Sequence, residues 1–288
     1  MKKIKNMRKL ISSNEGVAGI LVALLLIGLF FSAIAFVQSV YVPQWMSQKE
    51  SEHMGDVANQ FSQLKFSIDT LSVLNQPNSQ ISNPITLGSD EMPFLNTMRS
   101  YGSLNLLPND YKISIKHKYS AVEKTYILGA IKYDADNSYY IDQSYVYENG
   151  ALIMSQPSGD IVAVQPAFTV VDTTDLSFDI IRLVGVGGKT SASGYGTYPI
   201  QTKFSSSETH RINGVEQITI FNSHLNAWYN FFNDVLTDSA LNFTIDASAD
   251  NRLLTISFFD TEEDDVYLPS LSLNVIEIEI QITSGWVV

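Results

Sequence analysis

The segment Gly-Val-Gly-Gly-Lys-Thr at 185–190 resembles part of a phosphate-binding loop. That loop needs a glycine, four residues and then Gly-Lys-Thr, because its backbone amides must wrap the phosphates. Counting back from Gly188 puts the first glycine at position 183, where this chain has Leu183. The Gly/Ser/Tyr-rich residues 191–199 cannot open the helix whose N-terminus would hold the phosphate. We therefore interpret 185–190 as a glycine-rich loop between strands.

Two acidic groups could offer carboxylate oxygens to calcium. The first is the run 260–265, with Asp260, Glu262, Glu263, Asp264 and Asp265. The second is Asp134, Asp136 and Ser138, but loop position twelve, where a helix–loop–helix calcium site needs an acid, is Tyr145. Both groups also fit solvated hairpin turns, which is the interpretation we favour. We expect no metal site.

Four histidines could take part in acid–base chemistry, and they are scattered along the chain: His53, His117, His210 and His224. A Ser-His-Asp triad assembles only in space, and no Gly-x-Ser-x-Gly pattern supports one here. The chain has no cysteine, which excludes thiol catalysis and thiolate metal sites. We expect no enzymatic activity, no catalytic residue and no cofactor. An enzyme would need His117, His210 or His224 to meet a serine and a carboxylate in a cleft.

An uncharged run of 32 residues, Val17–Gln48, follows five basic residues at positions 2, 3, 5, 8 and 9. Its apolar part, 17–42, exceeds the about 20 helical residues that cross a hydrocarbon core of about 30 Å. It is also longer than the apolar region of a secretory signal peptide, about 7–15 residues. The basic cluster predicts a cytoplasmic N-terminus and a cell-surface location for the remainder, in a single-pass membrane protein.

Beyond the predicted transmembrane helix, Pro43 predicts a kink, and Tyr41 and Trp45 fit the level of the lipid headgroups. Six apolar residues then follow a heptad-like 3-4-3-4-3 spacing: Met54, Val57, Phe61, Leu64, Ile68 and Leu71. This stripe could pair helices between subunits, or it could pack on the chain's own domain. We expect segment 43–75 to be an amphipathic helical stalk that lifts the domain clear of the membrane.

The rest of the chain predicts a mainly β domain. Segment 76–110 is rich in Pro, Asn, Ser and Gly and is expected to be linker and loops, with one short strand near Leu104. From Tyr111 the hydrophobic period becomes two. Further strands are expected at about 125–133, 139–147, 151–155, 161–171, 176–186, 216–222, 252–259 and 271–282. The fold class predicted for 111–288 is an antiparallel β-sandwich with one short helix, N-capped by Ser223.

The chain's net charge is −12, and five of its 18 basic residues and one of its 30 acidic residues precede the apolar run. The remainder therefore carries −16. Such a surface repels nucleic acid, and we expect no nucleic-acid partner. Asn242-Phe-Thr244 is a possible N-glycosylation acceptor, accessible if the domain lies outside the cell.

Residues 12–16, Ser-Ser-Asn-Glu-Gly, followed at once by the apolar Val17–Ala23, resemble an archaeal type IV prepilin leader. Segments 61–71 and 145–154 and the helix that contains Trp228 extend the resemblance. Most of the chain is similar to archaeal type IV pilin-like surface proteins. The resemblance implies that a prepilin peptidase removes the basic leader 1–16 after Gly16, leaving Val17 first. It implies membrane lipid and other pilin-like subunits as partners of the apolar helix, and it implies no particular activity.

The sequence departs from bacterial pilins, which carry a glutamate at the fifth mature position, here Leu21. Cleavage before Phe36 by ordinary signal peptidase, after Ala33-Ile-Ala35, is an alternative. We predict a non-enzymatic structural subunit or minor component of a pilus-like filament or of the cell envelope. The alternative is an anchored β-sandwich that binds a glycan or another envelope protein, with Tyr195 and Tyr198 as candidate contacts.

Overall fold

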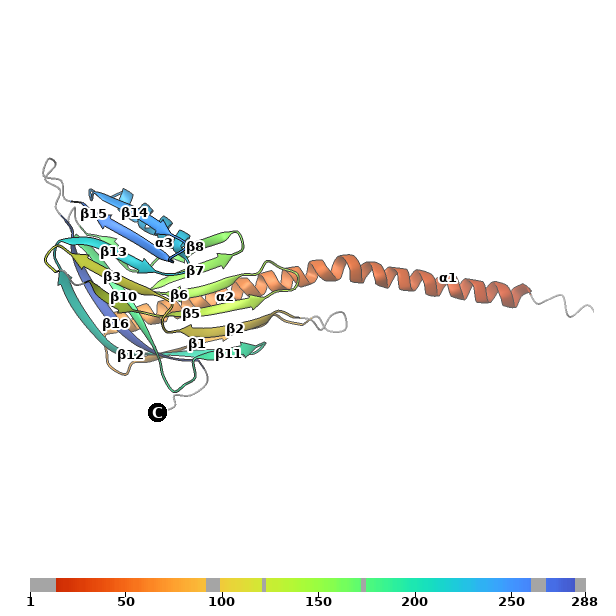
Figure 1. Cartoon of the computed structure of the whole chain (residues 1–288). Helices are drawn as coiled ribbons and strands as arrows, with labels where there is room; N and C mark the ends of the chain where they lie inside the picture. Colours follow the sequence, from red (N-terminus) through yellow and green to blue (C-terminus); the bar gives the residue numbers. More distant parts are fainter. Residues whose placement is uncertain (1–13, 92–98, 121–122, 172–174, 260–267, 283–288) are drawn as a thin grey trace, which may run out of the picture.

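One long helix dominates the molecule and ends inside a β-rich domain (Figure 1). The computed structural model describes residues 14–91, 99–120, 123–171, 175–259 and 268–282, with the side chains of 14–16 left out. The helix comprises α1 (Asn14–Phe36), the π-helical turn η1 (Val37–Tyr41) and α2 (Val42–Leu74). It ends at Asn75, whose φ of +49° is the left-handed conformation that stops helices.

Pro43, where the sequence predicts a kink, lies just after a π-helical turn, and the helix continues through it. Pro43 lies in the first turn of α2, directly after η1. Proline lacks an N–H, and its ring clashes with the carbonyl one turn back in a regular α-helix. A π-helical turn widens the backbone at that point, so the helix can accommodate the proline and continue.

The remaining elements are strands in three sheets and one short helix. They are β1 (Gln80–Thr86), β2 (Tyr101–Leu107), β3 (Lys112–His117), β4 (Lys124–Ile127), β5 (Ala130–Asp136), β6 (Ser144–Glu148), β7 (Ala151–Gln156), β8 (Gly159–Val164), β9 (Phe168–Val170), β10 (Asp175–Gly185), β11 (Ser191–Gly194), β12 (Thr197–Ile212), β13 (Val215–Phe221), α3 (Leu225–Thr237), β14 (Phe243–Ser248), β15 (Leu253–Phe258) and β16 (Ser270–Ile282). The mainly β fold with a long N-terminal helix, predicted from the sequence, is confirmed.

The strand orders are β1-β12-β16-β10-β9 in the first sheet, β11-β2-β5-β6-β7-β8 in the second and β14-β15-β13-β3-β4 in the third. Neighbouring strands are antiparallel apart from β10 and β16, which run parallel from Asp175↔Ser270 to Gly185↔Ile280. The strands that the structure describes thus form three sheets.

The amphipathic stripe of α2 lies in the core of the domain. Its six residues, Met54 to Leu71, are at most 2% exposed. They pack among β1 and β12 of the first sheet and β6 and β7 of the second. The stripe therefore packs on the chain's own domain, and the stalk predicted for 43–75 is wrong: this helix is a central core element.

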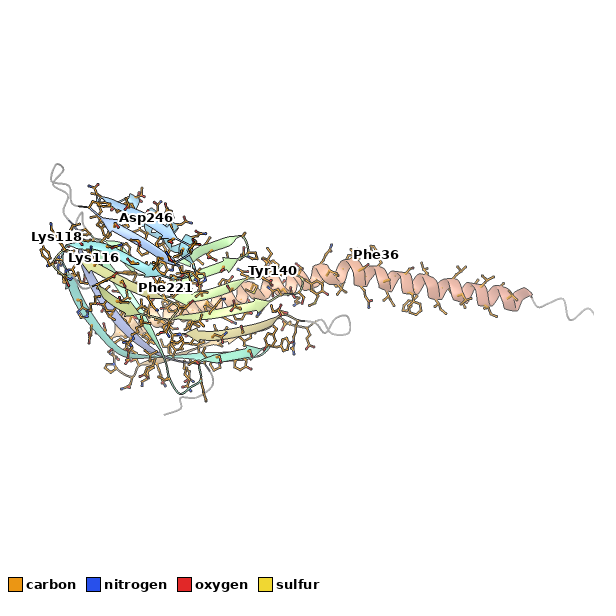
Figure 2. All side chains as sticks on the ribbon, viewed as in Figure 1. Phe36, Lys116, Lys118, Tyr140, Phe221 and Asp246 are labelled. Atoms are coloured by element: carbon orange, nitrogen blue, oxygen red, sulfur yellow. The ribbon has the colours of Figure 1, made fainter. Side chains whose placement is uncertain are left out.

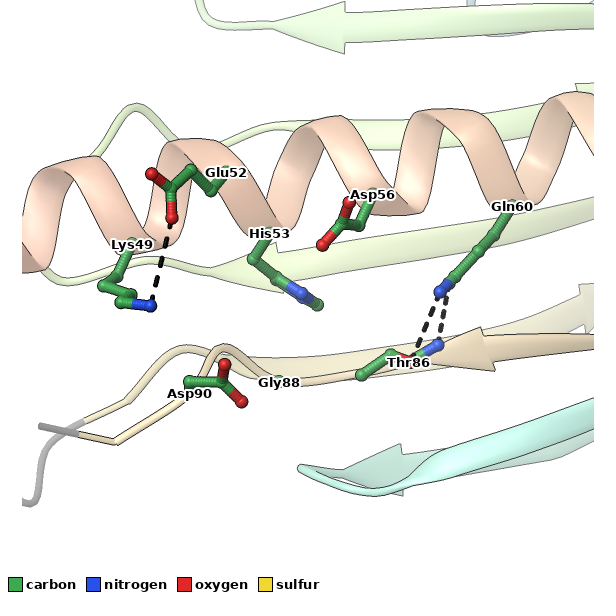
Figure 3. Close-up of a pocket in the computed structure, with 8 residues that line it drawn as sticks. All are labelled: Lys49, Glu52, His53, Asp56, Gln60, Thr86, Gly88 and Asp90. Carbon is green, nitrogen blue, oxygen red and sulfur yellow. Dashed lines mark hydrogen bonds and ion pairs between the residues drawn. The ribbon is translucent and has the colours of Figure 1, made fainter.

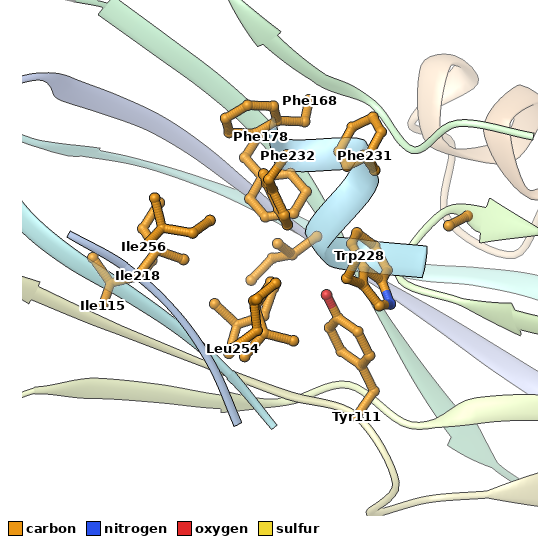
Figure 4. Packing of buried hydrophobic residues seen from close by; sticks show 14 of the residues in the cluster. Tyr111, Ile115, Phe168, Phe178, Ile218, Trp228, Phe231, Phe232, Leu254 and Ile256 are labelled. Carbon is orange, nitrogen blue, oxygen red and sulfur yellow. The ribbon is translucent and has the colours of Figure 1, made fainter. Parts of the chain in front are cut away.

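A second hydrophobic cluster is built around α3 and includes residues from all three sheets (Figure 4). Trp228, Phe231 and Phe232 of the helix meet Tyr111 and Phe168 at ring-centroid distances of 5.1–6.2 Å. Strands β6 and β7 separate the two clusters, so both of their faces are buried. Fully buried strands lose their polar alternation, as Tyr-Val-Tyr at 145–147 does.

Several boundaries of strands and of one helix differ from those that the sequence predicts, because contacts between distant segments set them. Segment 76–110, expected to be linker and loops, contains β1 as well as the strand near Leu104. The expected strand 125–133 is divided at Gly129, where φ is +77°, and 161–171 is divided around Pro166. The sixteen-residue β12 was not predicted, because it has few apolar side chains and gains its order from β1 and β16. The N-cap of α3 is His224 and not Ser223, whose hydroxyl accepts a hydrogen bond from Arg252.

Only part of the first sheet has a face exposed to solvent. In β16, Ile276, Ile278, Ile280 and Ile282 face the α2 cluster, as the alternation predicts. On the opposite face Glu277 and Glu279 are partly exposed and pair with Arg182 and Lys203. Nearer the N-terminus of β16 the opposite face is buried, because Leu271 and Leu273 on that face belong to the cluster around α3. Each face of this sheet therefore covers a different core.

Two glycines allow a matched stability test. A Cβ at Gly102 would lie 2.1 Å from the Leu87 carbonyl oxygen, whereas one at Gly55 of α2 meets no atom within 4 Å. We expect Gly55→Ala to raise the free energy of unfolding by roughly 0.5–1 kcal/mol, because alanine loses less backbone entropy. Gly102→Ala should lower it. Denaturant unfolding of the full chain in detergent measures both, and changes of the same sign would contradict this packing.

Candidate functional site

The largest candidate functional surface is the apolar rod formed by α1 and η1. Every described side chain from Val17 to Tyr41 is exposed apart from the half-buried Val37. Figure 2 shows these side chains projecting around the rod. By length and composition, this is one helix able to cross a membrane. Twenty-five residues extend about 37 Å at 1.5 Å per residue, compared with a hydrocarbon core of about 30 Å.

The rod meets the domain without an intervening spacer. Val42 and Met46 are 5% and 0% exposed, whereas Tyr41 and Trp45 are 43% and 40% exposed on the other side of the helix. The rings of Tyr41 and Trp45 lie 5.7 Å apart, and Phe36 packs edge-on against Tyr41. The domain therefore covers one side of the helix from Val42 onward, and an aromatic group occupies the opposite side.

Next to this junction, a buried carboxylate ties the helix to the loop between β5 and β6. Glu50 is 0% exposed, and its oxygens accept hydrogen bonds from the backbone amides of Ser138 (3.1 Å), Tyr139 (2.8 Å) and Tyr140 (2.7 Å). Hydrogen bonds from several amides to one ionised carboxylate are strong and directional. The loop is therefore held at a fixed position against α2.

A small polar cleft of about 120 Å³ lies between α2 and the segment after β1 (Figure 3). Lys49, Glu52, His53, Asp56 and Asp90 are among the residues that line it. Lys49 contacts Glu52 at 3.9 Å, and Gln60 bonds to Thr86 through both its amide nitrogen and its oxygen. In the described part of the chain, no group of three or more His, Cys, Asp or Glu side chains is arranged to hold a metal ion.

His53 in this cleft has a structural role. Its Nε2 lies 3.0 Å from the Tyr133 hydroxyl and 3.3 Å from the Leu87 carbonyl oxygen, and Tyr133 donates to the same carbonyl at 2.8 Å. Burial lowers the pKa of His53, outweighing Leu87 and the nearby acids, so the ring stays neutral near pH 7. The histidine joins α2 to the first and second sheets.

A second buried carboxylate, Glu148, lies at the end of β6 and faces α3. It is 0% exposed and accepts a 2.6 Å hydrogen bond from Trp228 Nε1. Both of its oxygens lie 3.3 Å from His224 Nδ1. The Asn149-Gly150 turn that follows has positive φ at both residues, which is the type I′ hairpin geometry that positions Glu148. Asn149 Oδ1 accepts from the Ile181 amide and links this hairpin to the first sheet.

The Glu148–His224 contact predicts a pH-dependent stability. Burial would lower the pKa of His224, but Glu148, with Asp160 and Asp110, outweighs it and the pKa is raised above 6.5. The resulting stability is fully present below pH 6.5 and is lost as the pH rises through the raised pKa. The contribution of His53, whose pKa is lowered, changes only below pH 6.5. Thermal unfolding of the chain should therefore show a decline in Tm above pH 6.5 that is smaller in His224→Gln; equal declines would contradict the prediction.

The other histidines named from the sequence are dispersed. His117 lies at the end of β3, and His210 of β12 lies 3.6 Å from Glu208. His224 contacts Glu148 through its ring Nδ1, and its backbone amide donates a hydrogen bond to Asn222 Oδ1. Among the described hydrogen bonds, none joins His117, His210 or His224 to a serine hydroxyl.

The remaining predicted sites have simple structural surroundings. Segment 185–190 connects β10 to β11, and a strand rather than a helix follows it. Asp134 lies 2.8 Å from Lys132, while the acidic run 260–265 lies outside the described residues. Asn242 is half-buried just before β14. The leader residues 1–13 are outside the described residues, and Gly16 and Val17 lie in the first turns of α1.

The two tyrosines proposed as glycan contacts do not both present free rings. Arg99 covers one face of the Tyr195 ring at 4.1 Å from its centroid, and Tyr101 meets this ring edge-on. Tyr198 lies in β12 and packs against the α2 cluster. Of the two rings, only Tyr198 is therefore packed inward, whereas Tyr195 remains 43% exposed.

No family model, no curated protein and no solved structure matches this chain.

Proposed function

We propose that this protein is a membrane-anchored, pilin-like surface protein. It acts as a structural subunit or minor component of a type IV pilus-like filament or of the cell envelope, and not as an enzyme. One observation carries the proposal: a single helix is an exposed apolar rod over Val17–Tyr41 and the core of the domain over Val42–Leu74.

An apolar rod of this size is unfavourable in water, at about 25 cal/mol per Å² of exposed apolar surface. Lipid chains or the rods of other copies can cover it. The basic leader favours a cytoplasmic N-terminus, which places the domain outside the cell. The continuity of rod and domain core suits a structural role, because the domain's orientation is fixed relative to the rod.

The N-terminal residue of the protein recovered from its native membrane tests this proposal. Mass spectrometry should find Val17, the first residue left by a prepilin peptidase. Intact Met1 would contradict pilin-type processing and favour a single-pass anchored binding module. A start at Phe36 would contradict anchoring altogether, since signal peptidase would then have removed most of the rod.

A further inference from the structure

We propose that the loop Asn137–Gln143, here called the rim loop, is a second membrane contact that lies on uncharged or zwitterionic lipid headgroups. This inference rests on the proposed anchoring of the rod. It goes further by assigning a lipid-binding surface to the β domain itself.

The first argument is distance along the helix. The aromatic pair Tyr41 and Trp45 has the amphipathic character of residues at the headgroup level. Glu50, which binds the rim loop, lies five residues after Trp45, or about 7.5 Å farther along the axis. The headgroup region on each side of a bilayer is several ångströms thick, since the whole bilayer measures about 40–45 Å around a core of about 30 Å. The rim loop therefore reaches the outer headgroups.

The second argument is the position of the loop on the domain. Figure 2 places Tyr140 at the end of the domain from which the rod emerges, with Lys116 and Lys118 at the opposite end. Because Val42 is already buried, no flexible spacer can raise this end of the domain away from the membrane.

The third argument is the chemistry and rigidity of the loop. Ile141 is 51% exposed, although an isoleucine normally favours burial, and Tyr139 and Tyr140 are half-buried beside it. Glu50 fixes the amides before Ile141, and Asn137 Nδ2 donates to the Ile141 carbonyl oxygen at 3.0 Å. The loop thus presents an apolar side chain at low further cost in conformational entropy.

Charge selects the kind of lipid. Asp136 and Asp142 are exposed on either side of the apolar tip. Their charges oppose contact with anionic headgroups, so uncharged or zwitterionic lipids are the partner that the loop fits.

The absence of cysteine allows site-specific labelling of the full chain. Fluorophores are attached to Ile141→Cys, to Asp246→Cys on the exposed far part of the domain, and to Phe30→Cys in the rod. Each protein is placed in zwitterionic nanodiscs that contain lipids carrying a nitroxide quencher, either on the headgroup or in the acyl chain. We expect the headgroup quencher to act severalfold more strongly at position 141 than at position 246. We expect the acyl-chain quencher to act at position 30.

The outcomes separate the two proposals. Quenching at position 30 with equal, weak quenching at 141 and 246 would overturn the rim contact and leave the anchor standing. No quenching at position 30 would overturn both. Anionic nanodiscs should reduce quenching at 141 and not at 30; equal quenching at 141 in both lipids would refute the charge selection.

Glu50 is a positioning residue in this proposal. Glu50→Gln replaces one accepting oxygen with an N–H₂ group that cannot accept from the loop amides. In the Ile141→Cys background it should reduce headgroup quenching at 141, while quenching at position 30 in a Phe30→Cys version stays unchanged. Full quenching at 141 in the Glu50→Gln variant would overturn this role.

Discussion

Phe61→Ala should lower the free energy of unfolding by about 3–5 kcal/mol, as truncations of large core side chains do. Phe61 is 0% exposed, and its ring lies 6.4 Å from that of Tyr133 and 6.2 Å from that of Tyr145. Its removal leaves a cavity between the helix and the second sheet. Denaturant unfolding of the full chain in detergent, followed by near-ultraviolet circular dichroism, reports the loss.

Phe66 provides the matched control on the same helix. It is 72% exposed, so Phe66→Ala should change the free energy of unfolding by less than about 0.5 kcal/mol. If α2 were instead a stalk outside the domain, Phe61→Ala would be as mild as Phe66→Ala. A small effect of Phe61→Ala would therefore contradict the placement of α2 in the core.

Glu148→Ala should lower the free energy of unfolding by about 1–3 kcal/mol, because it leaves a buried hydrogen-bond donor without its acceptor. The Trp228 N–H would be left without its carboxylate acceptor, and His224 would lose the negative charge that raises its pKa. The variant should also lose the decline in Tm above pH 6.5 that His224 produces in the natural sequence.

Glu216→Ala is the control for this second substitution. Glu216 pairs with Lys116 at 3.0 Å on the surface, where such a pair contributes about 1 kcal/mol or less. Thermal and denaturant unfolding of both variants give the comparison. A Glu148→Ala effect as small as that of Glu216→Ala, with an unchanged pH profile, would show that the buried contact is not important for stability.

The sequence predicts the features that depend on local periodicity. The spacing of Met54 to Leu71 predicts an amphipathic helix. The alternation of Ile276 to Ile282 predicts the last strand and its buried face. The residues that make up each signal lie close together in the sequence, so each signal can be recognised without knowledge of the fold.

Other features depend on contacts between distant segments and carry no local signal. The sequence leaves open whether the α2 stripe packs on a second subunit or on the chain's own sheets. The polar β12 becomes a strand because β1 and β16 flank it. Glu50 and Glu148 look like ordinary surface acids, and only tertiary structure brings Glu50 to the rim loop and Glu148 to Trp228. The two carboxylates on which the candidate site and its stability depend were therefore missed.

The continuity of the helix has a mechanical consequence. A load applied to the apolar end, by a neighbouring subunit or by extraction from a bilayer, passes along Val17–Leu74 into the centre of the domain. There it acts as shear between α2 and the sheets on either side, so many side-chain contacts resist it together instead of one after another. The β domain should thus tolerate tension along the rod better than a transverse pull that peels its edge strands away.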